Sequence, residues 1–124
     1  DNRHQAFAED AFKFLDTMGD QYDLIILDPP AFAKHKKVLN NALQGYRKLN
    51  AKAFEKIRPG GILFTFSCSQ VVSKENFRLA GFSAAAQNGR NVRILHQLTQ
   101  PADHPVNIYH PEGEYLKGLV LYVE

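Results

Sequence analysis

The chain has 124 residues, 44% hydrophobic and 23% charged, with a formal net charge of +2. No stretch approaches the roughly 18 consecutive apolar residues of a membrane span, and no signal-peptide pattern leads the chain. The single cysteine excludes an internal disulfide, and no Cys/His spacing predicts a metal site. We therefore expect a cytoplasmic domain with no membrane partner and no metal. Because it opens at Asp1 and not at a methionine, we also expect it to be part of a longer protein.

The first quarter of the chain predicts three short elements. His4–Ala8 has the pattern of a weak strand, and Asp10 is placed to cap a helix over Ala11–Met18 that Gly19 ends. Leu24–Leu27 is a continuous apolar run, rich in branched side chains and too short for a helix. It predicts a strand that is buried on both faces, as parallel sheets require.

A carboxylate and two prolines follow this strand. Asp28 stands where open α/β sheets bind ligands, at the carboxyl end of a strand. Pro29 and Pro30 cannot extend the ladder and fix a rigid, extended segment after it. An aspartate in this place can also be a turn residue only, but a connecting turn does not need two prolines.

The remaining elements alternate between helix and strand. A long amphipathic helix is predicted over Val38–Ile57, a buried strand over Ile62–Ser67 and a helix over Ser73–Gln87. Further strands are expected at Val92–Leu98 and Gly118–Val123. This order predicts an α/β fold with a mostly parallel, doubly wound sheet.

Two features between these elements have both a chemical and an ordinary interpretation. Cys68 lies at the carboxyl end of the second buried strand. Its side chain is either a nucleophile or an inert group packed in the core. The stretch Lys34–Arg58 holds eight Lys or Arg residues against one Glu. It is either a phosphate-binding stripe or a solvated helix face.

Four motifs in this order resemble a known family. They are Asp28-Pro29-Pro30, the turn Pro59-Gly60-Gly61, the segment Thr65–Ser69 and a tail that contains Ala102–Pro105 and Pro111–Gly118. Together they resemble the C-terminal half of a class I S-adenosylmethionine-dependent methyltransferase. More narrowly, they are similar to the bacterial 23S ribosomal RNA cytosine-5 methyltransferases of the ribosomal RNA large subunit methyltransferase I family.

The resemblance implies that residues 1–124 are the C-terminal part of a Rossmann-like methyltransferase domain that lacks its first strands. The family's glycine-rich loop and ribose-binding acidic residue would lie upstream of Asp1, as would its small RNA-binding domain. The implied cofactor is S-adenosylmethionine and the implied partner is ribosomal RNA. The isolated chain is expected to be inactive.

The resemblance also implies roles for particular residues. Cys68 would add to carbon 6 of cytosine, and Asp28 would hydrogen-bond the ring. Asp10, Asp28, Pro29 and Pro30 would contact the cofactor, although helix capping is an equally good role for Asp10. Residues assigned to the substrate are Phe32, Lys36, Ser67, Ser69 and His104. Lys36 would neutralise a phosphate or favour the thiolate of Cys68, unless it is a solvated loop lysine.

Three alternatives are weighed against this interpretation. Amino-group methyltransferases place an aromatic residue directly after Asp-Pro-Pro, whereas here Ala31 precedes Phe32. A nucleotide hydrolase would need a phosphate-cradling Gly-x-x-x-x-Gly-Lys motif, which does not occur in the sequence. The third alternative is a catalytically silent fragment that self-associates through the unpaired edge of Leu24–Leu27.

Overall fold

The computed structural model describes residues 2–19, 22–32 and 38–124. The elements in chain order are α1 (Ala11–Thr17), β1 (Leu24–Leu27), α2 (Leu39–Lys56), β2 (Gly61–Ser67), α3 (Lys74–Gln87), β3 (Val92–Leu98), the 3₁₀ turn η2 (Pro111–Gly113) and β4 (Lys117–Val123). The α/β class is thus confirmed. None of the described helices has the length and the apolar character needed to cross a membrane.

The strands form one mixed sheet in the order β1-β2-β4-β3. β1 pairs with β2 in parallel, while β4 lies between β2 and β3 and is antiparallel to both. β1, β2 and β3 therefore point the same way, as the prediction of a mostly parallel sheet requires, and β4 alone is reversed. Among the described strands β1 is an edge strand, paired on one side only.

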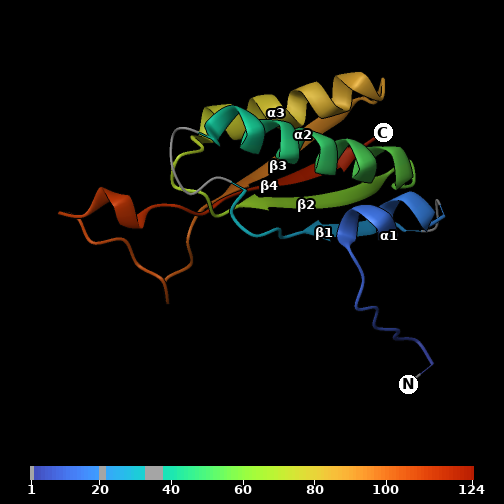
Figure 1. The fold of residues 1–124 in the computed structure, drawn as a ribbon, viewed down its shortest axis with the longest axis horizontal. Coiled ribbons are helices and arrows are strands. Elements are labelled where there is room, and N and C mark those ends of the chain that lie inside the picture. The colour runs from blue at the N-terminus through green and yellow to red at the C-terminus, as the bar shows by residue number, and fades with distance from the viewer. Residues whose placement is uncertain (1, 20–21, 33–37) are drawn as a thin grey trace.

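The helices cover one face of this sheet. In Figure 1, α2 and α3 lie side by side over the strands, and α1 packs against α2. Alternate residues of β2, such as Leu63 and Thr65, are fully buried beneath α2 and α3, and Ile25 and Leu27 of β1 join the same core. Ile62, Phe64 and Phe66 of β2 alternate with them and are only half-buried.

Two sequence predictions, for β1 and for His4–Ala8, are wrong. β1 is not buried on both faces, because Leu24 and Ile26 are 53% and 60% exposed on the face that carries no helix. His4–Ala8 is not a strand, because these residues are exposed and extend away from the sheet (Figure 1), so that no neighbouring strand supplies hydrogen bonds.

The predicted helix boundaries are close to those observed. Asp10 caps α1, as expected, by accepting a hydrogen bond from the Lys13 N–H at 3.2 Å. The helix ends at Thr17, one residue before the predicted end. Ser73 likewise caps α3 by accepting from the Asn76 N–H at 3.0 Å. Both caps satisfy backbone donors that a helix leaves unpaired at its first turn.

We predict opposite effects for two glycine-to-alanine substitutions. A Cβ at Gly61, the first residue of β2, would lie 2.8 Å from the Arg58 carbonyl oxygen and 3.0 Å from that of Asp23. Because backbone cannot swing aside, Gly61→Ala should lower the free energy of unfolding by about 2 kcal/mol. Gly81→Ala in α3 is the control, since a Cβ there meets nothing within 4 Å, and it should raise stability by roughly 0.5–1 kcal/mol. Chemical denaturation of both variants tests this, and equal effects would contradict it.

Candidate active site

Parallel pairing brings the two predicted catalytic residues to the same end of the sheet. Leu27 at the end of β1 pairs with Thr65 of β2, and Asp28 and Cys68 directly follow these strands. Asp28 is exposed, while the Cys68 thiol is half-buried and free. A carboxylate and a thiol therefore share the edge where α/β sheets bind ligands.

The four residues assigned to the cofactor line a single hollow of about 400 Å³. They are Asp10, Asp28, Pro29 and Pro30. Phe32 and the apolar side chains of Ile26, Leu27 and Leu49 complete its wall. The hollow thus combines two carboxylates with an apolar lining, even though Asp10 and Asp28 come from different elements.

Ser67 and Ser69, which flank Cys68, are buried and form hydrogen bonds within the protein. The Ser67 hydroxyl donates to the Tyr46 hydroxyl at 2.9 Å and accepts from the Ser69 N–H at 3.3 Å. The Ser69 carbonyl accepts a hydrogen bond from the Lys117 Nζ at 2.6 Å. These bonds fix the backbone on both sides of the thiol. Ser67 and Ser69 therefore hold the Cys68 segment in place.

Tyr46 of α2 is a site residue that the sequence prediction missed. Its side chain is fully buried, and its ring packs against Phe32 at 4.7 Å and Phe77 at 5.5 Å between centroids. Burial raises the pKa of Tyr46 above its usual 10.0. Interactions with the Ser67 hydroxyl and the Phe32 backbone lower this pKa, and the negative charge of a Cys68 thiolate raises it further. In the sequence, Tyr46 was visible only as one apolar position of an amphipathic helix.

Phe32 is half-buried on this tyrosine. Its ring also lies 3.3 Å from where a Cβ on Gly45 would stand, so the absence of a side chain at Gly45 makes room for the ring. Phe32 therefore anchors the segment after Asp28 to α2. Its predicted contact with the substrate remains a prediction.

His104 lies in the long loop between β3 and β4, which projects from the sheet (Figure 1). Because β3 is parallel in direction to β1 and β2, this loop leaves the same end of the sheet as Asp28 and Cys68. Gln70 ties the loop to the Cys68 segment by donating to the Glu112 carbonyl at 2.9 Å. The His104 side chain is exposed, 3.4 Å from the Asp103 carboxylate.

Some residues of the basic stretch Lys34–Arg58 form contacts within the protein. Arg47 donates to the side chains of Gln44 at 3.0 Å and Gln87 at 2.7 Å, and Lys52 forms an ion pair with Asp16. These contacts favour a structural role for Arg47 and Lys52. Lys36 lies outside the described residues, so its assignment is not addressed. No group of three or more His, Cys, Asp or Glu that could hold a metal occurs within the described ranges.

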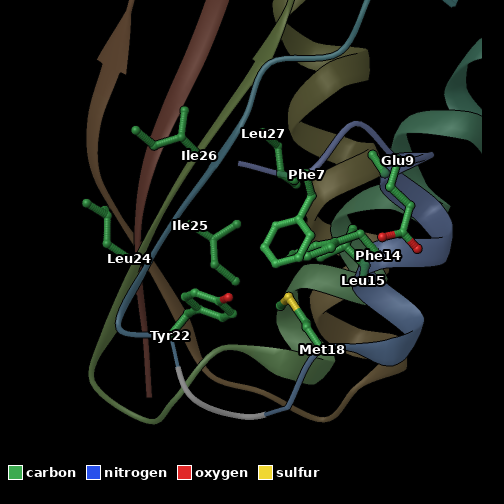
Figure 2. Close-up of a pocket in the computed structure, with 11 residues that line it drawn as sticks. Phe7, Glu9, Phe14, Leu15, Met18, Tyr22, Leu24, Ile25, Ile26 and Leu27 are labelled. Atoms are coloured by element: carbon green, nitrogen blue, oxygen red, sulfur yellow. The ribbon is translucent and has the colours of Figure 1, made fainter. Parts of the chain in front are cut away.

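A second hollow of about 390 Å³ lies between α1 and β1. Figure 2 shows Phe7, Phe14, Met18 and Tyr22 gathered in it, while Leu24 and Ile26 point to the opposite face of the strand. The hollow is lined mainly by apolar side chains, together with Glu9, and lies beside β1, the edge strand among the described strands. The sequence prediction assigned no ligand to it.

The fold defined by this sheet and these helices is that of S-adenosylmethionine-dependent methyltransferases. A solved structure described as the methyltransferase SMU.776 in complex with SAH superposes with a TM-score of 0.73 and 22% identity, over 92% of this chain and 30% of that one. A second, described as a SAM-dependent methyltransferase from Streptococcus mutans, gives 0.72 and 20% identity, over 92% of this chain and 29% of that one. No family model matches the chain.

Sequence relatives narrow the class of protein further. The chain is 46% identical over 116 residues to "Ribosomal RNA large subunit methyltransferase I" of Tolumonas auensis, covering 91% of this chain and 29% of the relative. It is 43% identical over 120 residues to the protein of the same name from Aeromonas hydrophila, covering 94% and 30%. The predicted resemblance to the ribosomal RNA large subunit methyltransferase I proteins is thus confirmed along nearly the whole chain. The chain spans about 30% of the length of these relatives.

We predict that Tyr46→Phe destabilises the chain and alters its response to alkali. Loss of the hydroxyl leaves the buried Ser67 O–H without its acceptor, which should cost about 1–2 kcal/mol at pH 7. Because the pKa of Tyr46 is raised in the folded state, its contribution is complete below pH 10 and is lost as the pH rises through the folded value. The unfolding free energy of the unmodified chain should therefore fall more steeply above about pH 10 than that of Tyr46→Phe.

Tyr109→Phe is the matched control for this prediction. Tyr109 is 85% exposed in the β3–β4 loop, so its loss should change stability by less than about 0.5 kcal/mol. Parallel pH curves for Tyr46→Phe and the unmodified chain would argue against the burial that raises the pKa of Tyr46.

Proposed function

We propose that residues 1–124 are the C-terminal part of a class I methyltransferase domain, and that the parent protein methylates carbon 5 of a cytosine in ribosomal RNA. The observation that carries this proposal is the location of Asp28 and Cys68 directly after neighbouring parallel strands. The names of the sequence relatives support ribosomal RNA as the substrate. Such a substrate agrees with the cytoplasmic location expected from the sequence.

The proposed cofactor is S-adenosylmethionine, which supplies the methyl group. The hollow beside Asp28 fits it, because carboxylates suit the amino and hydroxyl donors of a nucleoside and apolar walls suit its ring. We assign Asp28, Pro29 and Pro30 to one side of the cofactor. Asp10 already accepts a helix-cap hydrogen bond through Oδ1, and we assign its other oxygen to the adenine amino group.

Cys68 is the proposed nucleophile. Carbon 5 of cytosine is a poor nucleophile, so the ring must be activated before it can accept a methyl group. The Cys68 thiolate forms a bond to carbon 6, and the electron pair of the carbon 5–carbon 6 double bond makes carbon 5 nucleophilic. Once carbon 5 is methylated, it loses its proton to a base, the double bond re-forms and the thiolate leaves.

Asp28 is the proposed electrostatic partner of the ring. As the thiolate adds to carbon 6, electron density moves onto the pyrimidine and its ring nitrogen becomes more basic. Asp28, exposed at the end of β1, can accept a hydrogen bond from the cytosine amino group or share a proton with that ring nitrogen, which stabilises the charge shift. On the substrate side we retain Phe32, His104 and Lys36 as contacts to RNA, while Ser67 and Ser69 are buried and hold the Cys68 segment.

These roles are proposed for the parent protein, because the chain spans about 30% of its relatives' length. We expect the isolated 124-residue chain to be inactive and to bind the cofactor at least a hundredfold more weakly, about 2.7 kcal/mol. The physical reason is that the hollow opens to solvent, so these residues alone enclose the cofactor incompletely.

Substitution of Cys68 tests the proposed chemistry. In the parent protein, Cys68→Ala should abolish methyl transfer to RNA, because no other cysteine occurs in these 124 residues, while cofactor affinity stays within a few fold. Transfer of a labelled methyl group to RNA gives the rate, and calorimetric titration gives the affinity. Ser83→Ala, which removes an exposed hydroxyl from α3, should leave both values unchanged. Normal turnover of Cys68→Ala would refute the nucleophile assignment and leave an inert, half-buried thiol.

A second proposal is that the isolated chain self-associates through β1. Among the described strands this one is paired on one side only, and its Leu24 and Ile26 expose apolar surface next to the half-buried Ile62 and Phe64. Exposed apolar edges of this kind pair readily with a second copy.

Charge placed on this edge should prevent association. Ile26→Lys should give a monomer by light scattering where the unmodified chain gives larger species, because a buried lysine at an interface is costly. Leu79→Lys is the matched control, since Leu79 is equally exposed, at 59% against 60%, but lies on α3. If both variants associate like the unmodified chain, or the unmodified chain is monomeric, β1 is not the interface.

A further inference from the structure

Lys117 is a buried cation next to Cys68 that the proposed chemistry has not used. It is the first residue of β4 and pairs with Ser67 in the β2–β4 ladder. Its side chain is only 7% exposed. The ladder thus brings a lysine from near the end of the chain to the residue that precedes the thiol.

The ammonium group of Lys117 is held on the other neighbour of Cys68. Its Nζ donates to the Ser69 carbonyl at 2.6 Å. Lys117 therefore spans the Cys68 segment, with its backbone at Ser67 and its charge at Ser69. Within the described part of the chain, no carboxylate forms an ion pair with it. A buried charge held by a carbonyl alone is costly, so a nearby negative charge would stabilise it.

The charged groups around Lys117 come from several elements. Burial lowers the pKa of Lys117, the charge that Cys68 carries as a thiolate raises it, and the positive charge of Lys74 on α3 lowers it. Lys74 itself pairs with Glu114 at 3.2 Å, in the loop before β4. From α2, the Tyr46 hydroxyl also senses the Cys68 charge. Among these groups Lys117 is the buried cation.

We propose that Lys117 is a positioning residue that keeps Cys68 in its thiolate form for attack on the pyrimidine. This inference rests on the proposed function, in which Cys68 is the nucleophile. In this role Lys117 acts through its positive charge and transfers no proton. Its charge favours the thiolate before the sulfur–carbon 6 bond forms, and it favours the same thiolate again as the leaving group when that bond breaks.

The reaction of Cys68 with iodoacetamide provides a test that does not depend on methyl transfer. Cys68 is the only cysteine, so mass spectrometry of the alkylated 124-residue chain reports this thiol alone. Rates are measured from pH 6 to 10 for the unmodified chain and its variants. Lys117→Gln keeps a donor for the Ser69 carbonyl but removes the charge, and Lys117→Arg keeps the charge.

We expect Lys117→Gln to lower the alkylation rate at pH 7 by roughly threefold to tenfold and to move the half-reaction point upward by up to about one pH unit. Lys117→Arg and the exposed control Lys13→Gln should both stay within about twofold of the unmodified chain. If circular dichroism shows that Lys117→Gln does not fold, Lys117→Met replaces it, since it fills similar volume without a buried donor, and the same shift is expected. An unchanged pH profile in a folded, uncharged variant would overturn the proposal.

The two proposals fail in different ways. If Lys117→Gln shifts the alkylation profile but Cys68→Ala retains methyl transfer, the electrostatic pairing stands and the nucleophile assignment falls. If Cys68→Ala abolishes methyl transfer but the alkylation profile of Lys117→Gln is unchanged, Cys68 is the nucleophile and Lys117 serves only to hold the Ser69 carbonyl.

Discussion

The side chain of Tyr46 joins the helix layer to both segments of the candidate active site. Its hydroxyl accepts a hydrogen bond from Ser67, next to Cys68, and its ring packs against the ring of Phe32, four residues after Asp28. The parallel strands β1 and β2 determine that these segments meet at one edge, but a strand pairing leaves the loops beyond it free. A fully buried tyrosine that is hydrogen-bonded to one loop and packed against the other restricts this freedom, so the relative position of the carboxylate and the thiol depends on it.

One-sided packing explains the rest of the architecture. Ser67, the partner of Tyr46, lies on the same face of β2 as Leu63 and Thr65, and all three are fully buried. The opposite face offers Leu24 and Ile26 to solvent and leaves Phe64 half-buried. Burial of a methylene group contributes about 0.8 kcal/mol. A surface that covered this face would therefore be stabilised by burying its exposed apolar side chains. The core of this chain is therefore complete on the helix side and open on the other.

The sequence predicted what depends on local pattern and missed what depends on distant contacts. The periodicity of α2, the caps Asp10 and Ser73 and the buried run of β2 were all readable, because each is encoded within one element. The exposure of Ile26 was not, since an apolar run has the same appearance whether one face or two are covered. The roles of Tyr46 and Lys117 were also hidden, because their partners Ser67 and Ser69 lie 21 and 48 residues away in the sequence.

The two halves of the site differ in how firmly this chain holds them. The Cys68 segment is bonded to α2 through Tyr46, to β4 through Lys117 and to the β3–β4 loop through Gln70. Asp28 follows an edge strand with a neighbour on one side only, and the hollow beside it opens to solvent. Pre-organised groups cost less to use than groups that must first be ordered. These contacts therefore hold the proposed nucleophile in place, whereas the position of Asp28 and the shape of the proposed cofactor hollow would change with any strand that paired with the free edge of β1.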